Sequence, residues 1–218
     1  MKMEADMQTW FGWIKDNLKE GDKVGLDFTQ YPAYMLNVRF KDIKAKGITL
    51  VSTSNLVDSV WGADRPTRPA KEIFHLEVKY TGLTTLEKLE KVFSKIGAQT
   101  DCMLVTSLDE IAWLLNMRGT DIAYNPVFFA YAILFPDYKI DLFIDSDKVK
   151  DAALEYVQSI NVTLKSYVSI DENLQHLAQA GTKIGVDTKK CNSKLYEIIK
   201  PVAVEKDGVI EDLKALKT

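Results

Sequence analysis

The sequence predicts an α/β fold, with a mixed β-sheet flanked by helices and a partial copy of a related domain before it. Three observations support this prediction. From residue 71 onward, strand-like and helix-like segments alternate without long gaps, as in a layered α/β domain. Pro136-Asp137 is a hairpin signal and calls for an antiparallel pair within the sheet. Asp22-Lys-Val-Gly-Leu-Asp27 recurs as Thr182-Lys-Ile-Gly-Val-Asp187, which indicates a related strand in each half.

The first half of the chain offers few elements. We expect strands at residues 22–27 and 48–51, with one helix at Tyr31–Lys46 between them. This is too little for a complete layered domain of ordinary size, so residues 1–64 are interpreted as the carboxy-terminal part of a first domain.

The same strand-helix-strand order is expected near the end of the chain. There the strand at residues 182–187 is followed by a helix at Ser193–Ile199 and a strand at Val202–Val204. The pattern alone does not separate a true repeat from chance recurrence of a short motif. Two copies are also too few for a solenoid, which needs several repeats.

Asp64-Arg-Pro-Thr-Arg-Pro-Ala70 contains two prolines, which remove backbone donors and favour extended conformations in the preceding residues. Residues 65–70 are therefore predicted to be a linker, and residues 71–213 a second domain. Its first helix is expected at Thr84–Ile96, because apolar residues recur there at helical spacing and Thr84 or Thr85 is a suitable N-cap.

The remaining elements of the second domain follow from short apolar runs and turn residues. The predicted strands are Cys102–Thr106, Val127–Phe135, Lys139–Ile144 and Val162–Leu164. Two helices are expected at residues 147–159 and 171–181, the second with a charged first turn and a glycine stop. A hairpin and crossover connections together predict a sheet with both parallel and antiparallel pairs.

Composition excludes several classes of function. The chain has 218 residues, 46% of them hydrophobic, and a formal net charge of −3. This charge gives no electrostatic footprint for nucleic acid or for an anionic membrane surface. The amino terminus lacks the apolar run of a signal peptide, and no run of about 18 apolar residues occurs. Cys102 and Cys191 form no zinc motif, so we expect a soluble protein of the reducing cytoplasm.

The most informative segment is Leu108-Asp-Glu-Ile-Ala-Trp-Leu-Leu-Asn-Met-Arg-Gly-Thr-Asp121. Apolar residues at i, i+3, i+4 and i+7 predict a helix that ends at Gly119. Asn116, Arg118 and Asp121 would then lie on an exposed turn between buried elements. The guanidinium of Arg118 could form a bidentate pair with a carboxylate, while the short polar side chains of Asn116 and Asp121 are suited to stabilising a turn.

This segment, together with Asn125-Pro-Val-Phe-Phe-Ala-Tyr131, resembles the middle domain of cytosolic-type Xaa-Pro aminopeptidases, or aminopeptidase P. The resemblance extends through Asn55-Leu-Val-Asp-Ser-Val-Trp61, Tyr80-Thr-Gly82 and Leu142-Phe-Ile-Asp145, and thus covers nearly the whole chain. It implies a creatinase-type amino-terminal domain after the end of a related first one. It also implies that residues 214–218 begin a catalytic domain that this chain does not contain.

The resemblance implies a metal-dependent parent enzyme that releases the first residue of peptides with proline second. Its two divalent ions, expected to be manganese, would be bound in the absent catalytic domain, so we expect no cofactor here. The implied partners are the parent's own catalytic domain, short X-Pro peptides and a second subunit in a homodimer. No nucleic acid and no membrane is expected as a partner.

The residues themselves give little support for catalysis within this chain. His75 and His176 lack a second ligand at dedicated metal spacing, so surface or core roles are favoured for both. Asp141 and Asp145 are explained by the start and end of one strand. Cys102, Cys191 and Ser107 lack a neighbouring base or a nucleophile elbow, and core packing or helix capping is favoured. No phosphate-binding loop occurs.

The candidate functional residues are therefore Asn116, Arg118, Asp121, Tyr124 and Asn125. One interpretation is that Arg118 and Asp121 pin the loop to its own domain or to the catalytic domain. The other places all five at the substrate entrance of the parent enzyme, where aromatic side chains would add surface. At the level of the whole chain, the two hypotheses are a non-catalytic region for substrate gating and subunit assembly, and a stand-alone protein-interaction module without peptidase activity.

Overall fold

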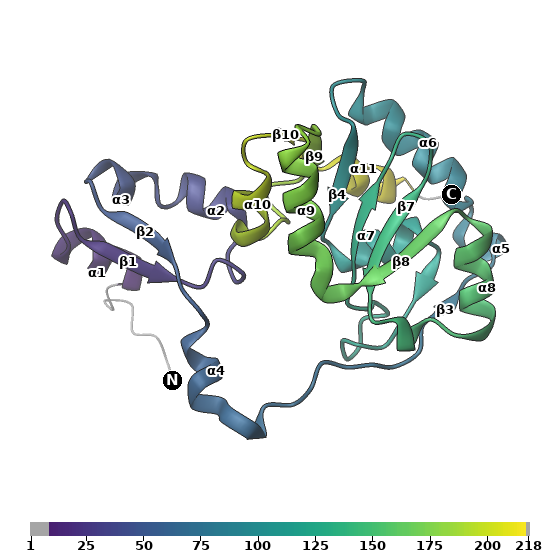
Figure 1. Cartoon of the computed structure of the whole chain (residues 1–218), viewed down its shortest axis with the longest axis horizontal. Helices are drawn as coiled ribbons and strands as arrows, with labels where there is room; N and C mark the ends of the chain where they lie inside the picture. The colour runs from purple at the N-terminus through teal and green to yellow at the C-terminus, as the bar shows by residue number, and fades with distance from the viewer. Residues whose placement is uncertain (1–8, 217–218) are drawn as a thin grey trace. The chain divides into compact units, whose positions relative to one another are not determined.

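The computed structural model describes residues 9–216, which form two compact units (Figure 1). The first unit runs to Arg65 and takes in Asn192–Lys194. The second comprises Pro66–Cys191 and the chain from Leu195 onward. Each unit contains one strand that carries the repeated sequence motif, β1 (Lys23–Leu26) in the first and β9 (Ile184–Val186) in the second.

The first unit contains a parallel pair of strands and short helices. Its elements are α1 (Trp10–Asn17), β1 (Lys23–Leu26), α2 (Ala33–Val38), α3 (Lys41–Ala45), β2 (Thr49–Ser52), α4 (Leu56–Trp61) and a 3-10 turn at Gly62–Asp64. β1 and β2 pair in parallel from Lys23 opposite Thr49 to Leu26 opposite Ser52. A small core gathers Ile14, Leu36, Phe40, Ile43 and Ile48.

The single helix expected at Tyr31–Lys46 is wrong, because the segment forms the separate helices α2 and α3. The break falls at Arg39 and Phe40, and Phe40 has φ −90° and ψ 6°. The Phe40 ring is fully buried and lies edge-on to the ring of Phe11, with 5.3 Å between the ring centroids. Burial of this ring therefore accompanies the break, and large apolar side chains are among the strongest contributors to a small core.

The second unit contains a six-stranded sheet in the order β10-β9-β4-β6-β7-β8. The strands are β4 (Cys102–Val105), β6 (Tyr131–Leu134), β7 (Ile140–Ile144), β8 (Val162–Ser166), β9 (Ile184–Val186) and β10 (Ala203–Glu205). β6 is antiparallel to both neighbours, and every other pair in the sheet is parallel. The predicted mixed sheet is confirmed.

Helices lie on both faces of this sheet (Figure 1). They are α5 (Val78–Thr81), α6 (Thr85–Ile96), α7 (Leu108–Leu114), α8 (Asp151–Ser159), α9 (Ile170–Gln179), α10 (Ser193–Ile199) and α11 (Val209–Ala215), with 3-10 turns at Ser146–Lys148 and Tyr167–Ser169. The main core joins α6, α7, α8 and α11 to one face of the sheet. Leu104, Ile133 and Phe143 alternate with the strand residues of that core and are also buried.

The repeated motif forms the same structure in both places. β1 and β2 are parallel strands with a helical connection of two short helices, and β9 and β10 are parallel strands joined through the single helix α10. The last aspartate of the motif also behaves alike in the two copies. Asp27 Oδ1 accepts from the backbone N–H of Thr29, and Asp187 Oδ1 accepts from that of Lys189. This shared turn supports a true repeat over chance recurrence.

The hairpin between β6 and β7 is confirmed at Pro136-Asp137, with Tyr138 at φ 64°. The strand expected at Val127–Phe135 is shorter than predicted, since only Tyr131–Leu134 pair as β6. The helix expected to begin at Asp147 begins instead at Asp151, after the 3-10 turn at Ser146–Lys148.

Helix α6 begins with the capping arrangement that the sequence suggested. Thr84 Oγ1 accepts from Glu87 N, and the Glu87 carboxylate accepts from Thr84 N. We expect Thr84→Ala to lower the free energy of unfolding by about 1 kcal/mol, because an orphan N–H then loses its acceptor. Urea unfolding followed by circular dichroism measures this change. Thr84→Ser retains the hydroxyl and is the control; a loss as large as that of Thr84→Ala would contradict the capping role.

Candidate functional site

Asn116 lies at the end of the helix that begins the most informative segment. That helix, α7, ends at Leu114 rather than at Gly119 as predicted, because Asn116 takes the left-handed conformation with φ 52°. Asparagine is one of the few residues besides glycine that adopt this conformation readily. Gly119 has another role, since a Cβ there would lie 2.9 Å from Phe128 Cβ.

The side chain of Asn116 is fully buried. Its Nδ2 donates to the carbonyl of Leu83 at 2.8 Å, and its Oδ1 accepts from the ammonium of Lys88. Lys88 also donates to the carbonyl of Trp113 and lies over the Trp113 ring. Burial, with a smaller contribution from Arg118, lowers the pKa of Lys88 to about 8. Asn116 and Lys88 thus close the carboxyl end of α7 from inside the core.

Arg118 belongs to a short strand that the sequence did not predict. β5 (Met117–Arg118) pairs antiparallel with β3 (Phe74–His75), which places Arg118 opposite Phe74. The guanidinium Nη1 donates to the carbonyls of Ala112 and Met117, and burial lowers its pKa. Within residues 9–216, no carboxylate lies at ion-pair distance from Arg118. It stabilises the last turn of α7 through carbonyl groups.

Asp121 is the anchor of the loop. Its Oδ2 accepts from the backbone N–H of Phe129 at 2.7 Å and pairs with the ammonium of Lys148. The two charged side chains are 0% and 1% exposed, respectively. The prediction that Asn116 and Asp121 lie on an exposed turn is therefore wrong, because both side chains find buried cations far away in the sequence.

Tyr124 and Asn125 form the exposed tip of the same loop. Tyr124 has φ 63° and its side chain is fully exposed, while Ile122 and Asn125 make an isolated bridge below it. A shallow hollow of about 440 Å³ runs beside the tip and is also lined by Lys71. The structure thus separates the five candidates into a buried pair, a half-buried arginine and an exposed tip.

Sequence reasoning missed Lys88 and Lys148, the two cations that bind the buried candidates. A signal existed for Lys88, which falls on the apolar stripe of α6 with Thr85, Leu89 and Val92. A lysine at such a position is either buried with a partner or extended to solvent. For Lys148, which follows a strand among other charged residues, no comparable signal exists.

The other titratable residues considered for metal binding lie in separate places. Asp141 pairs with Lys165 and Lys139, and Asp145 accepts from the backbone N–H of Asp147. His176 is exposed on α9. In the part of the chain that the structure describes, no three His, Cys, Asp or Glu side chains gather as metal ligands. The residues present therefore do not fit a two-metal centre.

Both cysteines are fully buried. Burial raises the pKa of the Cys102 and Cys191 thiols to about 12. A thiol with so high a pKa carries almost no thiolate near neutral pH, and thiolate is the nucleophilic form. The core-packing interpretation of both residues fits this environment.

His75 stacks on Tyr156 with 3.6 Å between ring centroids, and its Nε2 is buried without a hydrogen-bond partner among residues 9–216. Burial lowers its pKa. At pH values between this lowered pKa and the unfolded-state pKa of about 6.5, the unfolded chain binds more protons than the folded chain. His75 therefore lowers the free energy of unfolding as pH falls through this window. We expect His75→Phe to flatten this part of the pH dependence.

The midpoints of urea unfolding of the unmodified 218-residue chain and of His75→Phe, measured at a series of pH values, test this expectation. His176→Gln, which changes the exposed histidine, is the matched control and should leave the profile unaltered. An unchanged profile in His75→Phe would show that His75 contributes no pH dependence.

Comparisons with known proteins give one consistent result. Residues 64–218 match the model of the Creatinase/Prolidase N-terminal domain. The chain is 38% identical to a probable Xaa-Pro aminopeptidase P from Laccaria bicolor, covering 97% of this chain and 34% of that protein. A probable Xaa-Pro aminopeptidase P from Coprinopsis cinerea is 36% identical, with 97% and 36% covered. The chain thus spans about a third of the length of these curated relatives.

Among solved structures, the X-prolyl aminopeptidase of Caenorhabditis elegans matches the whole of this chain with a TM-score of 0.87 and 28% identity. The match covers 36% of that protein, which is described as a cytosolic enzyme with a di-nuclear active site. No helix within residues 9–216 has the length and apolar character needed to cross a membrane. With its mixed sheet and with a family match over more than half of its length, the chain belongs to the Creatinase/Prolidase N-terminal domain family.

Proposed function

We propose that this chain is a non-catalytic amino-terminal region of a metal-dependent Xaa-Pro aminopeptidase, in which it gates access to the active site and supports subunit association. The observation that carries the proposal is the match of the whole chain to the X-prolyl aminopeptidase of Caenorhabditis elegans, over 36% of that protein. The absence of a gathered ligand set within residues 9–216 supports a non-catalytic role. Peptide hydrolysis and two divalent ions, with manganese expected, would belong to another part of the protein.

Peptidase assays on this chain and on a version extended through the downstream coding sequence test the proposal. We expect hydrolysis of an X-Pro peptide with added Mn²⁺, and two bound metals per chain, only in the longer protein. Hydrolysis by the 218-residue chain alone would overturn the non-catalytic assignment. Inactivity of both versions would overturn the enzyme assignment.

Gating is assigned to the exposed tip of the loop, because Asn116 and Asp121 are occupied by partners inside their own unit. The fully exposed Tyr124 and its neighbour Asn125 are free to meet a peptide or the catalytic region. Shortening a side chain at this tip would then change the entry of long peptides and short peptides to different extents. The cytoplasm is the proposed location, in keeping with the cytosolic relative.

In the extended protein, Tyr124→Ala is expected to change kcat/KM for long X-Pro peptides more than for tripeptides. Tyr80→Ala, which removes another exposed tyrosine of the same unit, is the matched control. An equal change for all peptide lengths, or an equal effect of both variants, would argue against gating by this tip.

A stand-alone interaction module is the second candidate, and α4 favours it. This helix buries none of its residues, and Leu56, Val57, Val60 and Trp61 are all exposed. Exposed apolar residues grouped in this way are typical of association surfaces. Sedimentation of the 218-residue chain tests the assembly role: self-association that is lost in Val60→Ser supports subunit assembly, whereas a monomer in both forms argues against self-association through α4.

A further inference from the structure

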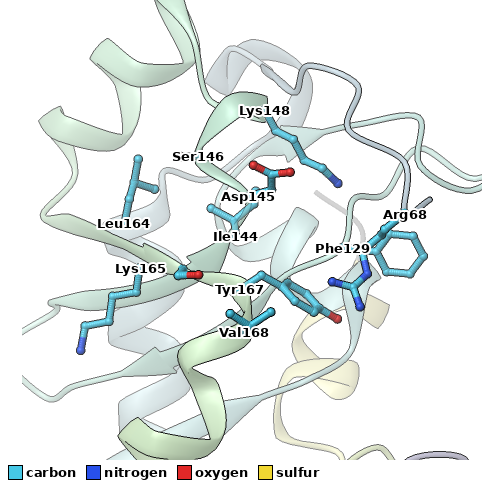
Figure 2. Close-up of a pocket in the computed structure, with 11 residues that line it drawn as sticks. Arg68, Phe129, Ile144, Asp145, Ser146, Lys148, Leu164, Lys165, Tyr167 and Val168 are labelled. Carbon is cyan, nitrogen blue, oxygen red and sulfur yellow. The ribbon is translucent and has the colours of Figure 1, made fainter. Parts of the chain in front are cut away.

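The second unit contains a pocket of about 460 Å³ that none of the roles above uses (Figure 2). Its lining comes from the ends of β7 and β8, the turns that follow them, the segment before β3, and Phe129 just before β6. The lining residues are Arg68, Phe129, Ile144, Asp145, Ser146, Lys148, Leu164, Lys165, Ser166, Tyr167 and Val168. The volume is in the range of pockets that take small molecules.

The place of the pocket in the sheet is one where ligands bind in other α/β proteins. β7 and β8 are parallel and end together at Ile144 and Ser166. Phe129 reaches the same edge because β6, which it precedes, runs in the opposite direction. In open α/β sheets, ligands bind outside the carboxyl ends of parallel strands.

Arg68 lies over an aromatic ring of the pocket wall. Its Cζ lies 4.2 Å from the centroid of the Tyr167 ring, and Tyr167 in turn packs on Tyr131 at 5.0 Å. No carboxylate within residues 9–216 pairs with this guanidinium. A guanidinium that contacts a ring and has no carboxylate partner can still donate two parallel hydrogen bonds to a ligand carboxylate.

The other two cations of the lining are already neutralised. Lys148 pairs with Asp121, and Lys165 pairs with Asp141 at 2.8 Å and donates to Asn173. Figure 2 shows the Lys165 side chain directed away from the other labelled charged groups. Arg68 is therefore the cation of this lining that has no ion-pair partner among residues 9–216.

Asp145 is the corresponding negative charge. Its Oδ1 accepts from the backbone N–H of Asp147, and among residues 9–216 no cation lies at ion-pair distance from its carboxylate. Arg68 and Asp145 line the same pocket without pairing with each other. Phe129, Ile144 and Leu164 supply the apolar part of the lining.

From this arrangement we infer that the pocket binds a small zwitterion with an apolar side chain, namely a free α-amino acid or a dipeptide. Arg68 binds its carboxylate, Asp145 binds its ammonium group, and the apolar residues contact the side chain. The inference rests on the pocket alone and stands whether or not the chain belongs to a peptidase.

Titration of the full chain with L-leucine, followed by two-dimensional NMR and calorimetry, tests the inference. We expect saturable binding, with amide shifts centred on residues 144–146 and 166–168. N-acetyl-leucine lacks the ammonium group, and leucinamide lacks the carboxylate, so each should bind about tenfold more weakly. Leucyl-leucine in place of leucine identifies whether the free amino acid or the dipeptide fits better.

Arg68→Gln and Asp145→Asn should each weaken leucine binding about tenfold. Both leave the fold intact, because Arg68 is exposed and asparagine keeps the cap that Asp145 provides. Arg39→Gln, an exposed arginine of the first unit, is the matched control. No saturable binding at millimolar leucine, or equal binding of leucine and leucinamide, would overturn the inference. Equal shifts with inorganic phosphate would replace it with a plain anion site.

Discussion

Asp121→Ala is expected to lower the free energy of unfolding by about 3–5 kcal/mol, the largest effect of any single change at the loop. Lys148 would be left as a buried ammonium without its carboxylate, and Phe129 N–H would lose its acceptor. The cost of a buried unpaired charge greatly exceeds the net gain from an intact pair. Equilibrium unfolding in urea, followed by tryptophan fluorescence and circular dichroism, measures the change.

The double variant Asp121→Ala with Lys148→Met separates the charge from the packing. We expect it to be more stable than Asp121→Ala alone, since no unpaired ammonium then remains. The exposed pair of Lys79 and Glu77 is the matched control, and Glu77→Ala should change stability by less than about 1 kcal/mol. Additive losses in the double variant would show that the pair is not energetically coupled.

Asn116→Ala is expected to cost about 3 kcal/mol. Lys88 loses its side-chain acceptor, the carbonyl of Leu83 loses its donor, and alanine must occupy a left-handed position at φ 52°. A buried charged group that loses a hydrogen bond costs about 1–3 kcal/mol, and the backbone conformation adds about 1 kcal/mol. The same urea titration gives the value.

Asn116→Gly divides these two contributions, because glycine accepts the left-handed backbone without strain. Asn116→Gly should be less destabilising than Asn116→Ala, but its free energy of unfolding should remain well below that of the unmodified chain. Tyr138→Ala is a matched control, because it also places alanine at a positive φ but outside the Lys88 network. If Asn116→Gly were as stable as the parent chain, the hydrogen bonds of Asn116 would contribute nothing.

Much of the fold could be predicted because its signals are local. Thr84 and Glu87 lie within one turn of each other, Pro136-Asp137 marks its own hairpin, and the repeated motif occupies six consecutive residues. Interactions of this range are decided by neighbouring residues, so a sequence shows them directly. The mixed sheet followed from the combination of that hairpin with the crossover connections.

The sequence predicted where the candidate loop lies along the chain, but it did not predict that two of its side chains are buried. Asn, Arg, Gly and Asp are common in exposed turns, and this composition favoured an exposed loop. Asn116 and Asp121 instead contact Lys88 and Lys148, each more than twenty residues away in the sequence. No local pattern states that two polar residues will meet such partners inside a core. The contacts of Arg68 with Tyr167 and of Phe74 with Arg118 could not be predicted for the same reason.

The position of β4 at the centre of the sheet has a consequence for the order of folding. Leu104 pairs on one side with Ile133 and on the other with Val186, which lies much further along the chain. Closing a long loop costs more chain entropy before any contact repays it, so distant strand pairs form slowly. The four strands from β4 to β8 would therefore assemble first and serve as the template on which β9 and β10 dock last.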